Sequence, residues 1–345
     1  MPREVARPAP ARSGLVSSSI SDVVGIKERT ATQRLFANQA VWVSLAVLLI
    51  MGLMSVRYPD QYGTLENFYN ITRNFSFIGI MALGMTAVII TGGIDLSVGS
   101  VMGVVGIVVG LVMHAGEPWW WAVLAGLGTG LICGIFNGIL ITRIGLSPFV
   151  TTLGTLSIAR SAAVLLSQNK MIYDFGPYAD QFFKIFGGQY IVANSVWLLL
   201  IMTVAFAFVL NATVWGRHLF AIGGNEHAAQ LTGVPVVRVK MQAYIFCSLC
   251  AAVAAIMLLG WQGSAINALG TGYELRVIAS TVIGGTNLIG GEGGAFGAFA
   301  GAALIEVIRN GLILAGVDSN YQGIFVGGFI ILAVLLERVR GRKRE

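Results

Sequence analysis

GRHLFAIGGNEHAAQLTGVP, at residues 216–235, separates two long apolar tracts of the sequence. The second half of this stretch predicts one short helix. Asn225 can accept a hydrogen bond from the first turn, and the charge of Glu226 suits a helix N-terminus. Gly233 favours the left-handed conformation that ends a helix, and Pro235 blocks its continuation. Roughly two turns of helix are not stable alone in water, so the segment is either a docking element for another protein or an ordinary connecting loop.

The composition of the chain assigns it to a lipid bilayer. Of its 345 residues, 56% are hydrophobic and 11% are charged, whereas a soluble domain carries about 25% charged residues. Apolar runs of roughly 17 to 24 residues recur along most of the sequence, and such a run can cross about 30 Å of hydrocarbon as a helix. We therefore expect an all-α polytopic membrane protein.

About ten transmembrane helices are expected, within a transmembrane domain at residues 39–337. Residues 1–38 and 338–345 are expected to form basic cytoplasmic tails, the first of them disordered. The eighth apolar run is short and rich in glycine, so it is either a complete span or a re-entrant segment. The expected spans are 40–56, 75–91, one ending near 113, 119–142, 149–167, 194–214, 241–260, 276–289, 295–316 and 320–336.

Basic residues predict the orientation of these spans. An even number of spans places both termini on one side of the membrane. Besides the two tails, the loops on that side hold Arg143, Arg217, Arg238 and Lys240. The opposite loops hold Arg57, Arg73, Lys170 and Lys184, together with several acidic residues. Because cytoplasmic loops carry an excess of Lys and Arg, we expect both termini and a loop at 215–240 in the cytoplasm. The net charge of +6 suits a membrane surface and does not indicate nucleic acid.

Glycine is frequent, at 45 residues, and some of it is regularly spaced. In the run 119–142, every fourth residue from Gly126 to Gly138 is glycine. These glycines fall on one helix face, and such faces let helices approach each other closely in a membrane. The spacing predicts a compact bundle and says little about the substrate.

No enzyme motif is evident in the sequence. The chain lacks the Gly-x-x-x-x-Gly-Lys-Ser/Thr phosphate loop and the common hydrolase signatures. Its three histidines, at 114, 218 and 227, are too scattered to indicate a metal site. We therefore predict no catalytic residue, no metal site and no cofactor bound by this chain. If ATP is used, a partner must bind it.

Polar side chains at membrane depth are the candidates for a transport path. A charge at the bilayer centre costs about 2.5–3.5 kcal/mol on insertion scales, so it usually faces the protein interior. The candidates are Asp95, Asn137, Arg160, Asn287, Glu306, Arg309 and Asn310. Asp95 is either a helix cap or a path residue, and Glu306 and Arg309 can equally form a structural ion pair. A path of amides and hydroxyls suits a neutral polyhydroxylated solute better than an ion.

Several motifs occur in a fixed order: TGGIDLSVGS at 91–100, AIGGNEHAA at 221–229, GTGYEL at 270–275, IGGTNLIGG at 283–291 and RNGL at 309–312. Together they resemble the membrane permease subunits of ribose-type, monosaccharide ABC importers. The resemblance covers roughly residues 40–337. Arg276 departs from it, because the pattern leads us to expect an acidic residue there.

This resemblance implies a permease that moves a monosaccharide or related polyol inward by alternating access. It implies a tandem-domain ATP-binding subunit that carries ATP and Mg, an extracytoplasmic sugar-binding protein, and a second permease copy or a sister permease. The implied location is the bacterial cytoplasmic (inner) membrane, as a multi-pass protein of the lipid bilayer. The residues implied to couple the chain to the ATPase are Gly223, Gly224, Asn225, Glu226, Ala228 and Ala229.

Two other functions remain open at this point. A proton- or sodium-coupled secondary transporter could use Asp95, Glu306 and the intramembrane arginines as its charges. Uptake by such a carrier would collapse with an uncoupler and survive depletion of ATP. A channel or scaffold without energy coupling would bind no ATPase through residues 215–240.

Overall fold

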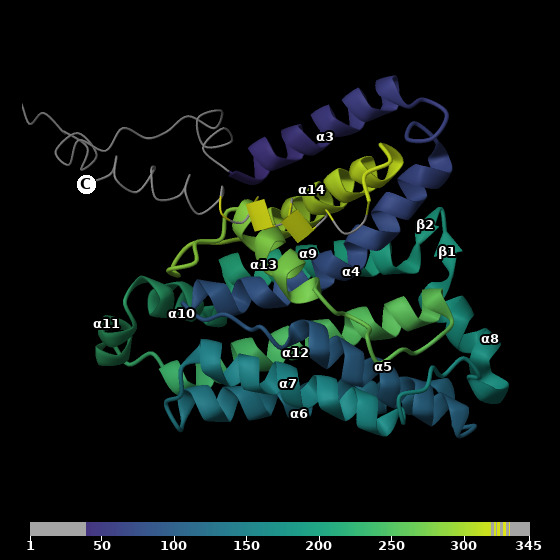
Figure 1. The fold of residues 1–345 in the computed structure, drawn as a ribbon. Helices are drawn as coiled ribbons and strands as arrows, with labels where there is room; N and C mark the ends of the chain where they lie inside the picture. Colours follow the sequence, from purple (N-terminus) through teal and green to yellow (C-terminus); the bar gives the residue numbers. More distant parts are fainter. Residues whose placement is uncertain (1–38, 319–320, 322, 325–326, 329–330, 332–345) are drawn as a thin grey trace, which may run out of the picture. The chain divides into compact units, whose positions relative to one another are not determined.

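The computed structural model of the chain describes residues 39–318, 321, 323–324, 327–328 and 331. The two expected tails, 1–38 and 338–345, and most of the expected tenth span, 320–336, lie outside the described residues. Within them the chain is helical apart from loops and one antiparallel pair of two-residue strands, as the composition predicts (Figure 1).

The elements follow each other in this order: α3 (Gln39–Arg57), α4 (Leu65–Ile90), α5 (Val98–His114), α6 (Trp119–Thr142), α7 (Pro148–Leu166), η1 (Gly176–Tyr178), α8 (Ala179–Phe182), η2 (Phe183–Gly187), β1 (Gln189–Tyr190), β2 (Val192–Ala193), α9 (Asn194–Ala212), α10 (Val214–Gly224), α11 (Glu226–Leu231), α12 (Val236–Gln262), α13 (Tyr273–Ile283) and α14 (Ala295–Leu314).

Seven of the described helices are long and apolar enough to cross a membrane, namely α3, α4, α6, α7, α9, α12 and α14. The chain is therefore a multi-pass membrane protein. α5 has 17 residues and α13 only 11. The sequence led us to expect helix over 276–289, but α13 ends at Ile283 because Gly284 and Gly285 follow it. Gly285 has a φ of +99°, a conformation that glycine adopts readily and that stops a helix.

α4 begins at Leu65, whereas the sequence led us to expect a span that starts at Phe75. The Thr64 hydroxyl accepts a hydrogen bond from the Asn67 N–H at 3.1 Å and so caps the helix. Arg73 was expected in a loop, but it lies inside α4. Its guanidinium stacks over the ring of Trp261 at 4.1 Å, and this cation–π contact stabilises the charge within the helix.

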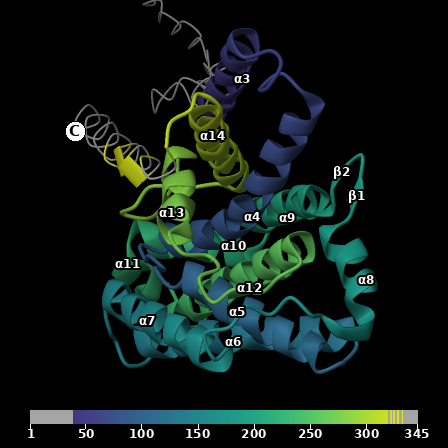
Figure 2. The same ribbon diagram turned by 45° about the vertical axis from the view of Figure 1, so that its right-hand side comes forward.

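α12 lies at the centre of the packing. It contacts α6, α4 and α5, and α4 and α12 are the most buried of the long helices. α14 packs against α4, α13 and α3, and α3 is the least buried of the long helices. Figures 1 and 2 both show α6 and α7 on one side of α12, and α3 and α14 on the other.

The glycine face of α6 packs directly on its neighbours, as predicted. A Cβ at Gly126 would lie 2.6 Å from a methyl group of Val109 on α5. A Cβ at Gly134 would lie 2.6 Å from the Cα of Ile245 on α12. Both distances are shorter than real side chains allow, so the close approach of α6 to α5 and α12 depends on glycine.

The chain between α12 and α13 is not helical, although it lies against the bundle interior. Residues 263–272 run alongside α5, with Ala265 against Gly110 and Gly270 against Gly99. Non-helical backbone is stable at membrane depth only where protein surrounds it or where it lines a water-filled cavity. Together with the short α13, this segment favours the re-entrant alternative for the eighth apolar run.

The glycine packing of α6 can be tested with a pair of variants on the same helix. Gly134→Val should lower the temperature of thermal unfolding in detergent, because overpacking typically costs about 1–3 kcal/mol. Gly128→Val is the matched control, since nothing lies within 4 Å of a Cβ at Gly128. Equal shifts for the two variants would contradict the close α6–α12 contact.

Candidate functional site

The polar segment between α9 and α12 folds into two helices. Asn225 caps α11 by accepting a hydrogen bond from the Ala228 N–H at 2.9 Å, which confirms the predicted short helix. Gly233, just beyond the end of α11, has a φ of +87°. This is the left-handed conformation that was predicted to end the short helix. α12 begins directly after Pro235, earlier than the expected 241.

α10 is the part of this segment that the sequence analysis missed. We expected the residues before Asn225 to form part of the loop at 215–240. The expectation is wrong for two reasons. The Thr213 hydroxyl caps α10 by accepting a hydrogen bond from the Gly216 N–H at 3.2 Å, and the helix buries Leu219 and Ile222 against the bundle. Capping and burial together outweigh the low helix propensity of glycine.

The predicted coupling residues lie on different sides of the segment. Those exposed to the surroundings are Gly224, Asn225, Glu226 and Ala228. Ala229 is buried and Gly223 is half-buried. Glu226 Oε2 accepts a hydrogen bond from Lys240 Nζ at 2.8 Å. A surface pair of this kind contributes about 0–1 kcal/mol, so it orients α11 on the start of α12 without adding much stability.

Gly223 connects the segment to the helix bundle. A Cβ at this position would overlap the carbonyl oxygen of Ile90 and the backbone of Gly291. The Gly291 N–H also donates a hydrogen bond to that carbonyl, at 2.9 Å. The ends of α10 and α4 and the turn before α14 are therefore in direct backbone contact. At Gly224, by contrast, nothing lies within 4 Å of a Cβ.

Asp95 is buried in the turn between α4 and α5. Its Oδ1 accepts hydrogen bonds from the N–H of Ser97 at 2.9 Å and from the Ser97 hydroxyl at 2.6 Å. The same hydroxyl accepts a hydrogen bond from Asn137 Nδ2 at 3.0 Å, and Asn137 Oδ1 accepts one from the Thr155 hydroxyl at 2.6 Å. These bonds connect the start of α5 to α6 and α7. They favour the structural role of Asp95 over a place in a path.

Arg160, on α7, reaches the non-helical segment 263–272. Its Nη1 donates hydrogen bonds to the carbonyl oxygens of Asn267 and Leu269, both at 2.9 Å. Glu274, in the first turn of α13, interacts with Arg160 electrostatically. Among the described residues, no group donates a hydrogen bond to the buried Oε2 of Glu274. Arg160 therefore donates hydrogen bonds to backbone carbonyl groups that lie outside any helix, and its charge partly neutralises the carboxylate of Glu274.

Glu306 and Arg309 form two hydrogen bonds with each other, at 2.6 and 2.8 Å, which confirms that they pair. Glu306 is almost completely buried in α14. The pair also interacts electrostatically with Tyr273 at the start of α13. Burial, and to a smaller extent the charge of Glu306, raises the pKa of the loop residue Tyr62 to about 12. The Tyr62 hydroxyl therefore stays neutral beside the carboxylate.

The two remaining candidates, Asn310 and Asn287, form hydrogen bonds through their side-chain amides. Asn310 exchanges two hydrogen bonds with Asn67 of α4, at 2.8 and 3.1 Å, and so connects α14 to α4. Asn287 Oδ1 accepts a hydrogen bond from the Ile289 N–H at 2.8 Å within the turn before α14. That turn also contains Gly291, so Asn287 shapes the backbone that contacts Gly223.

The structure places the path candidates in three groups. Asp95 and Asn137 lie at the start of α5. Arg160, Glu306 and Arg309 lie around the first turn of α13, with Asn310 beside them on α14. Asn287 lies apart, in the turn next to the Gly223 contact. Each side chain in the first two groups has at least one protein partner, although the buried Oδ2 of Asp95 accepts no hydrogen bond from any described group.

Two further residues belong to these groups but were not predicted as path candidates from the sequence. They are Glu274 and Asn67. Glu274 is part of a quoted motif, but its proximity to Arg160 depends on contacts between distant segments. Asn67 was assigned to a loop, and the cap signal of Thr64 three residues earlier could have placed it on a helix. Among the described residues, no group of three or more His, Cys, Asp or Glu is placed to hold a metal ion.

Comparisons with known proteins return membrane permeases. The model of the family described as the permease component of the branched-chain amino acid transport system matches residues 67–334. The probable ABC transporter permease protein y4mJ of Sinorhizobium fredii is 38% identical over 302 residues, which are 87% of this chain and 89% of the relative. The ribose import permease protein RbsC of Escherichia coli K12 is 36% identical over 296 residues, 85% of this chain and 92% of the relative. The autoinducer 2 import system permease protein LsrC of Photorhabdus laumondii is 33% identical over 300 residues, which are 87% of this chain and 89% of the relative. No solved structure matches the chain.

The ion pair in α14 can be tested for a structural role. Arg309→Met should lower the free energy of unfolding by about 3–5 kcal/mol, because it leaves the buried carboxylate of Glu306 without its partner. The double variant Glu306→Leu/Arg309→Met should recover most of that loss and keep transport, since apolar residues of similar size often replace a buried pair. Thermal unfolding in detergent and uptake in vesicles measure the two effects. A double variant that is stable but does not transport would place the pair in the path.

Arg160 can be tested in the same way. Arg160→Gln should lower the free energy of unfolding by about 1–3 kcal/mol, because two buried carbonyl groups lose their donor. Arg143→Gln is the control, since Arg143 is exposed and the change removes the same charge. If both variants unfold at the temperature of the parent protein, Arg160 does not hold the segment 263–272.

Proposed function

Because this chain belongs to the family of importer permeases described as the permease component of the branched-chain amino acid transport system, we propose that its cargo is a monosaccharide or a related polyol. The observation that carries the proposal is the 36% identity to the ribose import permease of Escherichia coli over 85% of the chain. The autoinducer 2 import permease supports it at 33% identity.

The chain is a permease subunit and not an enzyme or an ion-driven carrier, because its relatives are ABC transporter permeases. The energy therefore comes from ATP hydrolysis in another chain. We propose that this chain binds no cofactor, and that ATP and Mg bind to a partner ATPase of the tandem-domain type. A sugar-binding protein on the outer side and a second permease copy, or a sister permease, would complete the importer.

The proposed orientation in the bacterial inner membrane places α10 and α11 in the cytoplasm. It assumes ten spans with both termini on the cytoplasmic side. Arg217, Arg238 and Lys240 support it, because basic residues collect in cytoplasmic loops. The exposed residues of α11 would then face the ATPase.

The proposed mechanism begins at α11 and continues through Gly223. Closure of the ATPase on ATP would displace α11, whose exposed surface includes Glu226 and Ala228. The direct contact of Gly223 with Ile90 and Gly291 would transfer this displacement to the end of α4 and to the turn before α14. The packed helices would then change the side to which the path opens, because tightly packed interfaces switch between arrangements and do not deform continuously.

The experiment that tests the function uses the permease, its ATPase and its binding protein reconstituted in vesicles. Uptake of radiolabelled ribose should require ATP on the ATPase side and should survive an uncoupler. Uptake of a branched-chain amino acid is the competing result that the family description suggests, and it would overturn the proposed cargo. Uptake that needs an ion gradient and no ATP would overturn the mechanism.

The Gly223 contact predicts a specific coupling defect. Gly223→Ala should leave the ATPase bound but reduce ATP-driven uptake by about tenfold, which is within the range typical of coupling between sites, because the new methyl group forces α10 away from Ile90 and Gly291. Gly224→Ala is the matched control at the next position, where the structure has open space. ATP hydrolysis and uptake are measured on the same vesicles. Equal uptake by the two variants would show that the contact does not transmit the movement.

A further inference from the structure

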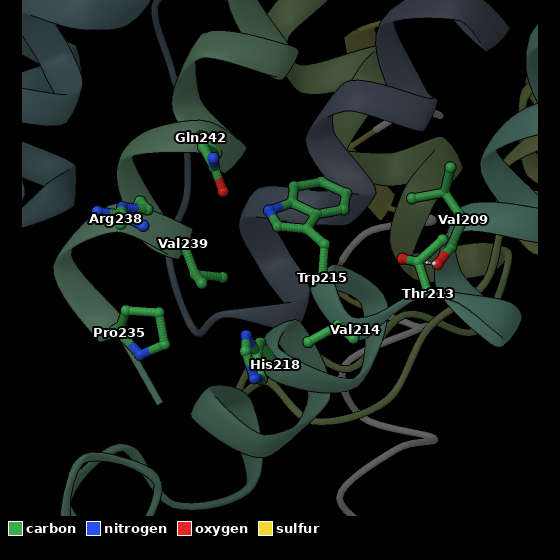
Figure 3. Close-up of a pocket in the computed structure, with 9 residues that line it drawn as sticks. All are labelled: Val209, Thr213, Val214, Trp215, His218, Pro235, Arg238, Val239 and Gln242. Carbon is green, nitrogen blue, oxygen red and sulfur yellow. Dashed lines mark hydrogen bonds between the residues drawn. The ribbon is translucent and has the colours of Figure 1, made fainter. Parts of the chain in front are cut away.

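An open hollow lies beside α10 and α11, which together form the proposed coupling segment (residues 214–235), between the end of α9, the start of α10 and the start of α12 (Figure 3). Its volume is about 540 Å³. The residues that line it are Val209, Thr213, Val214, Trp215, His218, Pro235, Arg238, Val239 and Gln242. Neither the path groups nor the exposed face of α11 contribute to it, so the hollow is separate from the machinery described above.

The polar groups of the hollow include donors without partners. Among the residues that the structure describes, none forms an ion pair with Arg238 or His218. Trp215 Nε1 is buried and donates no hydrogen bond to any described group. Figure 3 shows this nitrogen directed toward Gln242 and Val239, across the hollow. A buried donor without an acceptor is costly, so the hollow fits a ligand that brings an acceptor, and Arg238 favours a negatively charged one.

The rest of the hollow is largely apolar, and α9, which supplies Val209 to it, also carries an exposed apolar face. Val209, Val214 and Val239 form much of its wall. Val209 belongs to α9, next to Phe208, which is 66% exposed. Phe208 lies on the same face of α9 as Val204 and Ile201, both exposed as well. This apolar face is the surface that would meet acyl chains in a bilayer.

We propose that the hollow binds the headgroup of an anionic phospholipid. The phosphate would accept hydrogen bonds from Arg238 and Trp215 Nε1, and the acyl chains would follow the exposed face of α9. Basic pockets between transmembrane helices on the cytoplasmic side bind such headgroups in other membrane proteins. The proposal rests on the proposed function only for the side of the membrane on which the hollow lies.

A lipid in this position would connect the two ends of the coupling segment. Trp215 and His218 belong to α10, whereas Pro235 and Arg238 stand at the start of α12. One phosphate bound to both sides would keep α10 near α12 as the whole segment moves. An acidic side chain of the ATPase is the competing occupant, because it could meet the same donors from the cytoplasm.

Native mass spectrometry of the purified full-length chain tests the proposal, with phosphatidylglycerol as the anionic probe and phosphatidylcholine as the neutral one. The parent protein should retain one phosphatidylglycerol more tightly than phosphatidylcholine. Arg238→Gln should weaken that binding about fivefold, the effect expected for one basic residue near an anionic headgroup. Trp215→Phe should weaken it as well, because the ring stays and the N–H is lost. Arg217→Gln is the control, since Arg217 is exposed on α10 outside the hollow.

Two results would overturn the proposal. One is equal retention of the two lipids by the parent protein. The other is an Arg238→Gln variant that keeps phosphatidylglycerol but no longer co-purifies with the ATPase, which would assign the hollow to the partner protein. Because lipid retention is measured without transport, a failure of the proposed sugar import would leave this result unaffected, and the two proposals fail separately.

Discussion

Backbone N–H and carbonyl groups inside a membrane must find partners within the protein, and this constraint determines where the chain can leave the helical state. The non-helical segment 263–272 depends on Arg160 for two of its carbonyl groups and on Ile172 for two backbone bonds at Ala265. The turn before α14 depends on a bond from Gly291 to Ile90. Each interruption is therefore a place where distant segments meet, and two of the candidate residues, Arg160 and Asn287, make their contacts at these places.

Glycine makes these contacts between distant segments close. Along α6 it brings helix backbones into contact and gives a compact bundle. At Gly223 it brings three different backbones together, so no flexible side chain lies between the coupling segment and the ends of α4 and α14. In the proposed mechanism, a displacement of α11 would therefore be passed on through direct backbone contact and would not be absorbed by rotamer changes. This is why the proposed mechanism depends on one glycine and not on the salt bridge of Glu226, which lies at the surface.

The features that follow from local rules could be predicted from the sequence. The cap at Asn225, the stop at Gly233 and the glycine face of α6 each involve residues within a few turns of one another. The pairing of Glu306 with Arg309 belongs to the same class. α10 was missed because it lies in a polar interruption of the sequence and its stability comes from burial against the bundle. The hydrogen bonds of Arg160 with Asn267 and Leu269 join segments over a hundred residues apart. No pattern within a short stretch of sequence predicts them.

The most direct test of the account is a pair of distance measurements by double electron–electron resonance on the permease–ATPase complex. Spin labels replace Leu231 of α11, Ile289 of the turn before α14 and Ile144 between α6 and α7, which are 76%, 85% and 61% exposed. If Gly223 joins α11 to that turn, the distance from 231 to 289 keeps its distribution when ATP binds, while the distance from 231 to 144 changes. A shift between 231 and 289, or no change in either distance, would contradict the account.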